Sequence, residues 1–156
     1  MTGFLGEYES TLDPKGRFLL PSALKKQIAE GENRFVINRG FEKCLNLYPS
    51  KIWENIITER ISKLNDFDPK VRQFKLFFLG GATEVELDTA NRILLPPSLK
   101  EFAGLSKDIV LASNLNNIHI WDAGKYKQFF EDFSSENYSK LANEVLGSES
   151  AFGNLL

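Results

Sequence analysis

The side chains best suited to chemistry in this sequence are two acid–base pairs inside a repeated phrase. One copy of the phrase reads L-D-P-K-G-R and the other reads L-D-T-A-N-R. Each places an aspartate four positions before an arginine, as Asp13 and Arg17 and as Asp88 and Arg92. A guanidinium forms paired hydrogen bonds with phosphate or with a guanine edge. Contact of these arginines with a ligand is therefore one interpretation of the pattern.

The spacing D-x-x-x-R is weak evidence when it stands alone. A third copy, Asp68 and Arg72, lies at the start of an expected helix, where we expect an ion pair between neighbouring turns. For the other two copies the residues leave two interpretations open: the pair braces its own turn, or the arginine contacts a ligand. The two roles are compatible, since a carboxylate that holds a guanidinium in place reduces the order lost on binding.

The other reactive side chains do not form a catalytic set. His119 is the single histidine, and its alternation with isoleucines predicts an exposed strand position. Cys44 is the single cysteine, which excludes an intramolecular disulfide and favours a buried structural thiol. The sequence contains no zinc-binding spacing, P-loop or dinucleotide motif. We therefore expect a protein that is not an enzyme and that uses no cofactor, no metal and no small-molecule substrate.

Charge is divided unequally along the chain. The net charge is −2, which weakly disfavours nucleic-acid binding. Residues 1–77 carry 13 Lys and Arg against 10 Asp and Glu, whereas residues 78–156 carry 6 against 11. The first half is therefore the better candidate for contact with a polyanion. The sequence begins without a signal-peptide pattern and has no apolar run of membrane-spanning length, so we expect a soluble, intracellular protein with no membrane partner.

The repeated phrase predicts the same local structure twice, at an offset of 75 residues. Asp13 and Pro14 suit a type I turn, and Gly16 suits a left-handed position after it. Asn91 occupies that position in the second copy, and asparagine tolerates positive φ better than most residues. We expect a bulged hairpin at each turn, followed by an apolar strand that is buried on both faces and ends at a proline.

Other periodic segments assign matching elements to the two halves. Short helices are expected at residues 22–30 and 97–103, and hairpins at residues 35–48 and 109–121. One longer helix is expected to begin at a Ser50 cap, another to run from Asp68-Pro69 to Gly80-Gly81, and a helical pattern covers residues 124–146.

Neither half is large enough to bury its own apolar faces, so we expect the two to interlock. The sequence predicts an α+β fold: a small β-barrel built from two pseudo-twofold β-hairpin repeats, with short helices and a helical C-terminus. We expect the first repeat at residues 1–77, the second repeat with the C-terminal helices at residues 78–146, and a flexible tail at residues 147–156, the whole forming one intertwined domain.

Several phrases together resemble the MraZ family. They are the twin turn phrases, F-L-G-E-Y near the start, R-G-F-E-K-C-L-N-L-Y-P, F-F-L-G-G-A and I-x-I-W-D, and they extend from about Phe4 to Lys127. The resemblance implies the swapped-hairpin fold of the AbrB and MazE proteins. It also implies a bacterial transcriptional regulator, cytoplasmic and nucleoid-associated, that forms ring-shaped homo-oligomers. Such a protein binds short direct repeats in double-stranded DNA at the promoter of the division and cell-wall gene cluster.

In that family the D-x-x-x-R turns face the DNA. The resemblance therefore implies these DNA-binding residues: Asp13, Lys15, Arg17, Asp88 and Arg92. The second turn has no lysine, and Arg92 lies among Glu84, Glu86 and Asp88, so we expect it to bind more weakly. Further candidates for phosphate contact are Lys25, Lys26, Arg39 and Lys43.

An alternative of the same fold is an antitoxin-like module that binds another protein through a disordered tail. The C-terminal region here is helical in pattern and rich in Phe, which makes that alternative the weaker hypothesis.

Overall fold

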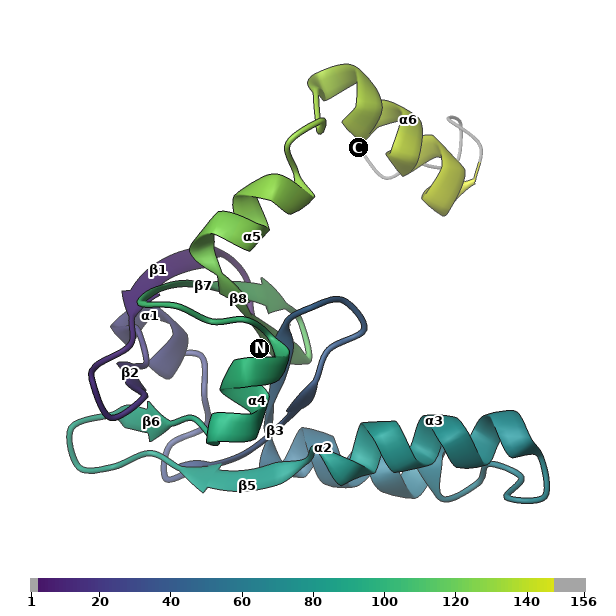
Figure 1. Ribbon diagram of the computed structural model, residues 1–156, viewed down its shortest axis with the longest axis horizontal. Helices are drawn as coiled ribbons and strands as arrows, with labels where there is room; N and C mark the ends of the chain where they lie inside the picture. The colour runs from purple at the N-terminus through teal and green to yellow at the C-terminus, as the bar shows by residue number, and fades with distance from the viewer. Residues whose placement is uncertain (1–2, 148–156) are drawn as a thin grey trace. The chain divides into compact units, whose positions relative to one another are not determined.

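A computed structural model describes residues 3–147 of the protein (Figure 1). The chain divides into two compact units, Met1–Ala123 and Gly124–Leu156. The first unit contains the strands β1 (Glu7–Thr11), β2 (Arg17–Leu19), β3 (Arg34–Arg39), β4 (Leu45–Pro49), β5 (Thr83–Glu86), β6 (Arg92–Leu94), β7 (Asp108–Asn114) and β8 (Asn117–Asp122). Its helical segments are α1 (Ser22–Lys25), α2 (Ser50–Ile56), the π-helical η1 (Ile57–Ile61), α3 (Pro69–Gly80) and α4 (Pro97–Phe102).

The strands of the two repeats interlock. Six antiparallel strands form the main sheet in the order β1-β7-β8-β4-β3-β5, and β2 pairs with β6 in a separate two-stranded ribbon. Apart from the hairpins β3–β4 and β7–β8, every strand pairing joins one repeat to the other. Each arginine turn connects an edge strand of the sheet to the ribbon, β1 to β2 and β5 to β6 (Figure 1).

The predicted α+β class is confirmed, but the closed barrel is wrong. β1 and β5 are the two edges of the main sheet, and no ladder within residues 3–147 joins them. The predicted hairpins close only at their tips, where the N–H of Asp13 donates to the Arg17 carbonyl at 2.9 Å and the N–H of Asp88 donates to the Arg92 carbonyl at 3.0 Å. Beyond the tips the flanking strands do not pair with each other, since β1 pairs with β7 and β2 pairs with β6. The separate ribbon takes one strand from each repeat, β2 from the first and β6 from the second.

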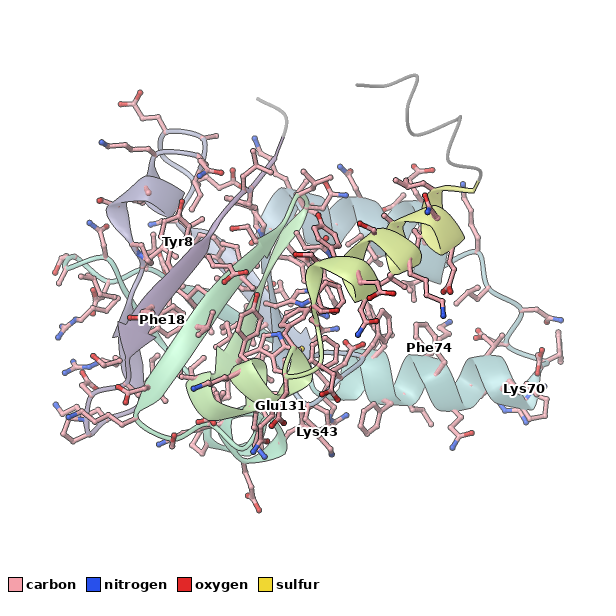
Figure 2. The ribbon with its side chains drawn as sticks, turned by 90° about the horizontal axis from the view of Figure 1, so that it is seen from above. Tyr8, Phe18, Lys43, Lys70, Phe74 and Glu131 are labelled. Atoms are coloured by element: carbon pink, nitrogen blue, oxygen red, sulfur yellow. The ribbon has the colours of Figure 1, made fainter. Side chains whose placement is uncertain are left out.

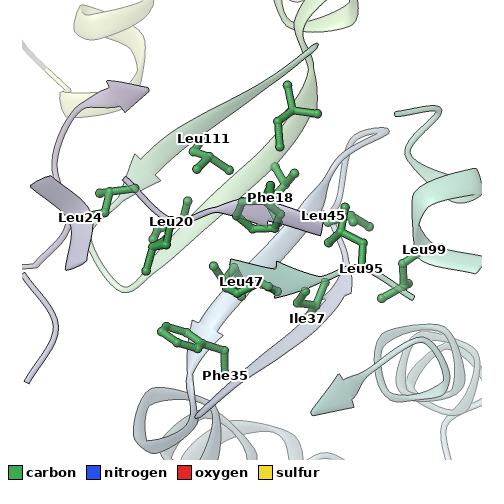
Figure 3. Packing of buried hydrophobic residues seen from close by; sticks show 14 of the residues in the cluster. Phe18, Leu20, Leu24, Phe35, Ile37, Leu45, Leu47, Leu95, Leu99 and Leu111 are labelled. Atoms are coloured by element: carbon green, nitrogen blue, oxygen red, sulfur yellow. The ribbon is translucent and has the colours of Figure 1, made fainter. Parts of the chain in front are cut away.

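Equivalent apolar residues of both repeats meet in one core (Figure 3). Its members include Phe18, Leu20, Leu24, Phe35, Ile37, Leu45, Leu47, Ile93, Leu95, Leu99 and Leu111. Burying one such side chain contributes roughly 1.5–3 kcal/mol. The prediction that β2 and β6 are buried on both faces is wrong, since Leu19 and Leu94 are each 55% exposed. The ribbon covers the core with the face that carries Phe18 and leaves its other face open.

The predicted end of one helix and the predicted start of another need correction. The helix after Pro21 ends at Lys25 instead of residue 30. Ser50 is the first residue of α2 rather than its cap, because Pro49 occupies the N-cap position and no side chain caps the helix there. Proline sets an extended backbone before both helices, which starts them without a polar cap.

Helix α3 begins as predicted, but the predicted ion pair between Asp68 and Arg72 is absent. Asp68 caps the helix and accepts a hydrogen bond from the Lys70 N–H at 2.9 Å. Arg72 does not pair with Asp68, as expected from the sequence, and instead donates from Nη1 to the Asp66 carbonyl at 3.0 Å. Figure 2 shows Lys70 at the far tip of the α2–α3 hairpin, well away from the strands around Phe18.

The second unit is helical, in agreement with the periodic pattern from residue 124 to residue 146. It contains the rest of α5 (Ala123–Phe129) and all of α6 (Ser135–Leu146), with a non-helical break between them. Ser134 caps α6 by accepting from the Asn137 N–H. The predicted tail lies outside the described residues beyond Gly147. No helix within residues 3–147 combines the length and the apolar character needed to cross a membrane.

Candidate nucleic-acid interface

The carboxylate of Asp13 organises the first turn. Its Oδ1 accepts the backbone N–H groups of Lys15 and Arg17 at 2.9 Å each, and its Oδ2 lies 2.7 Å from Arg17 Nε. Gly16 donates its N–H to the Asp13 carbonyl and has φ = 84°. The type I turn with a left-handed fourth residue is therefore confirmed.

The second turn repeats this geometry with different residues. Asp88 Oδ1 accepts the N–H groups of Ala90 and Arg92 at 2.9 and 2.8 Å, and Oδ2 lies 2.9 Å from Arg92 Nε. Asn91 adopts φ = 61° in the place of glycine. Two sequences that share only Asp and Arg thus form the same turn, which the Asp–Arg pair braces in both copies.

These hydrogen bonds keep both aspartates ionised. The backbone N–H of Arg17 is the largest cause that lowers the pKa of Asp13, and the backbone N–H of Arg92 does the same for the pKa of Asp88. An ionised carboxylate holds the guanidinium by its Nε side. Each arginine is consequently fixed in one orientation at neutral pH.

Each guanidinium retains a pair of donors. Within residues 3–147, the Nη groups of Arg17 and Arg92 make no hydrogen bond, and their side chains are 27% and 36% exposed. Ribbon pairing places Arg17 opposite Leu94 and Leu19 opposite Arg92, so all four side chains share the open face. A two-stranded ribbon with outward arginines has the dimensions and donors that suit the major groove of DNA.

The other candidates for phosphate contact are placed differently. Lys15 is exposed and lies in the first turn. Arg39 instead packs its guanidinium 4.2 Å from the Phe77 ring and donates from Nη1 to the Phe77 carbonyl at 2.9 Å. Lys43 Nζ lies 4.6 Å from the Phe102 ring. Arg39 therefore joins β3 to the end of α3, and its position favours a packing role over phosphate contact.

Neither Cys44 nor His119 contributes to this interface. Cys44 is fully buried, as predicted, and burial raises the pKa of its thiol to about 12. His119 is half-buried rather than exposed, and burial lowers its pKa. The prediction of an exposed histidine is wrong because β8 lies between β4 and β7 inside the sheet. No group of three or more metal-ligating side chains gathers in residues 3–147.

Sequence reasoning missed two lysines beside the first turn. Lys100 and Lys107 line the same groove as Asp13 and Pro14, although they belong to the acidic half of the chain. The equivalence of Lys25 and Lys100 in the repeats was the available signal. Each of the two short helices carries a lysine at this position. Only the pairing of β1 with β7 shows that the lysine of the second repeat lies beside the turn of the first.

The fold consists of two repeats that pair their strands with each other, and each repeat carries one turn in which an aspartate holds an arginine. It is therefore a duplicated α+β protein with exchanged strands. A family model described as "MraZ protein, putative antitoxin-like" matches residues 4–77 and again residues 78–148. The chain is 45% identical to a protein of Christiangramia forsetii named "Transcriptional regulator MraZ", over 96% of both chains.

Two further proteins with the same name, from Flavobacterium psychrophilum and Clostridium beijerinckii, are each 40% identical to this chain. The matches cover 95% and 91% of this chain and 94% and 96% of those relatives. The chain therefore belongs to the MraZ family, as its sequence motifs indicated.

Proposed function

We propose that this protein is a DNA-binding transcriptional regulator that recognises short direct repeats as a homo-oligomer. The observation that carries the proposal is the pair of braced arginine turns on a ribbon face, in a chain whose relatives are named transcriptional regulators. We assign DNA contact to Asp13, Lys15, Arg17, Asp88 and Arg92, with the two aspartates acting through their arginines. The repeats at residues 1–77 and 78–146 would each supply one turn.

Arg17 is the residue we expect to contact a base edge or a phosphate most strongly. Its Nε is held by Asp13, so the Nη pair enters the groove with little loss of freedom. Lys15, one residue before Gly16, is exposed and would contact phosphate. Arg92 would contribute less, because β5 beside it carries Glu84 and Glu86.

An oligomer reconciles this assignment with a net charge of −2. A single protomer offers few cations to a duplex, and its affinity would be low. Protomers arranged in a ring would engage successive repeats, since each bound turn raises the effective concentration of the next. Sites spaced along the promoter of a division and cell-wall gene cluster would suit such an assembly.

The experiment is a gel-shift or anisotropy titration of repeat DNA with the Arg17→Ala variant. We expect a loss of about 1–3 kcal/mol per bound turn if Arg17 reads a base. Arg72→Ala is the matched control, because it removes the same charge from a D-x-x-x-R spacing on α3 that is not part of a turn. Wild-type affinity in Arg17→Ala, or an equal loss in Arg72→Ala, would refute the assignment.

The alternative is an antitoxin-like module that binds another protein. An apolar stripe on α6 favours it, since Tyr138, Leu141 and Val145 are exposed at helical spacing. Purification of the protein from cells in a stable complex with a small toxin, together with no binding to repeat DNA, would support this alternative instead.

A further inference from the structure

A groove beside the first turn carries cations from the second repeat. Its volume is about 670 Å³, and it is lined by residues 11–14 of the first repeat and by Lys100, Ser106 and Lys107 of the second. Among the described residues that line the groove, Asp13 alone is acidic, and its Oδ2 lies 2.7 Å from Arg17 Nε. The groove therefore has excess positive charge directly beside the turn that holds Lys15 and Arg17.

The interlocked strands bring these lysines to the turn. The N–H of Leu12 donates to the carbonyl oxygen of Lys107 at 2.8 Å, immediately before Asp13. Lys100 lies in the last turn of α4. Lys107 is exposed and Lys100 is half-buried, and within residues 3–147 neither forms an ion pair with a carboxylate. Both ammonium groups are thus available to an anion.

The equivalent place beside the second turn is formed by different residues. There the N–H of Leu87 donates to the carbonyl of Asn33 at 2.9 Å, so asparagine takes the position of Lys107. Asn33 Nδ2 in turn donates to Glu86 Oε1 at 3.1 Å, and Glu86 stands where the first repeat has Thr11. Arg34, the residue after Asn33, lies opposite Glu86 in the pairing of β3 with β5. The two turns have nearly the same backbone but different surroundings.

We infer that Lys107 and Lys100 bind DNA phosphates flanking the first turn, so that each protomer presents one cationic turn and one weakly binding turn. This inference rests on the proposed function. A phosphodiester is the expected ligand, because a lysine ammonium is a compact point charge that contacts the backbone without reading sequence. The antiparallel ribbon places the second turn at the other end. The second repeat, although acidic overall, therefore supplies cations to the site of the first.

The test measures the affinity of the full-length protein for repeat and scrambled duplexes over a series of salt concentrations. We expect Lys107→Ala to reduce the slope of log K against log salt by about 0.9 for each bound protomer, and the Lys100→Ala/Lys107→Ala double variant by about twice that. Both duplexes should lose affinity by the same factor. Lys107→Arg should retain the wild-type slope, because it keeps the charge.

Lys70→Ala is the control, since it removes one lysine from the tip of the α2–α3 hairpin, away from the strands around Phe18 (Figure 2). We expect it to leave the salt slope unchanged. An unchanged slope in the Lys100→Ala/Lys107→Ala double variant, or an equal decrease in Lys70→Ala, would overturn the inference while leaving the proposed function intact. Failure of the wild-type protein to bind either duplex at low salt would instead refute the proposed function, and this inference with it.

Discussion

The substitution Gly16→Ala tests whether the first turn depends on a left-handed residue. Gly16 has φ = 84°, and a Cβ built there would have the Leu95 carbonyl oxygen as its nearest neighbour at 3.9 Å. The added methyl group therefore fits, and the cost is conformational. A non-glycine residue costs about 1–2 kcal/mol in this region, and the less flexible unfolded chain offsets about 0.4–1 kcal/mol of that. We expect Gly16→Ala to lower the free energy of unfolding by about 1 kcal/mol.

The assay is equilibrium unfolding in urea, followed by the fluorescence of Trp53 and Trp121. All variants are compared at one protein concentration, because association adds to the apparent stability. Gly16→Asn should lose less than Gly16→Ala, since Asn91 already holds φ = 61° at the equivalent position. Gly31→Ala is the control: Gly31 has φ = 83° with no atom within 4 Å of an added Cβ, so its loss should also be about 1 kcal/mol.

DNA affinity should separate these two glycines. Gly16→Ala disturbs the turn that orients Arg17, so it should weaken binding to repeat DNA, whereas Gly31→Ala should not. If Gly16→Ala proved as stable as the wild type, or if alanine and asparagine were tolerated equally at residue 16, the reasoning from the backbone angle would be refuted.

Two further properties follow from the ionisable groups. The stability contributed by Asp13 and Asp88, whose pKa values are lowered on folding, is present at neutral pH and is lost as the pH falls below about 4 and through the lowered values. The Asp13→Asn/Asp88→Asn variant should thus show a shallower loss of urea midpoint with acid; a loss as steep as in the wild type would contradict this. Burial raises the pKa of Cys44 to about 12, so iodoacetamide at pH 8 should modify the thiol only after unfolding, and rapid modification of the native protein would show the burial to be wrong.

Local features of this protein were predictable because their determinants lie within a few residues. The hydrogen bonds of Asp13 reach no further than Arg17, and the turn conformation depends on a residue that accepts positive φ. The burial of Cys44 was also predicted correctly, because a free cysteine without a reactive partner is commonly buried. By contrast, burial of Leu19 and exposure of His119 were wrong predictions, since an apolar or alternating pattern does not reveal whether neighbouring side chains cover the outer face of a strand.

The acceptors and rings that individual arginines contact were not predictable. Arg39 was a candidate for phosphate contact until the structure placed it against Phe77 and the backbone of Gly81. Asp68 and Arg72 have suitable spacing for an ion pair, yet a nearby carbonyl competes successfully for the guanidinium. An arginine has several acceptors within reach, and only packing decides among them.

The amino-acid sequence by itself determined the duplication, the two braced turns and the family, because these depend on residue identity at fixed short spacings. The tertiary structure alone decided that the sheet stays open, that β2 pairs with β6, and that Lys107 lies beside Leu12. The physical reason is that neither repeat can bury its apolar strands without the other. The electrostatic surroundings of each turn are therefore set by residues of the opposite half of the chain.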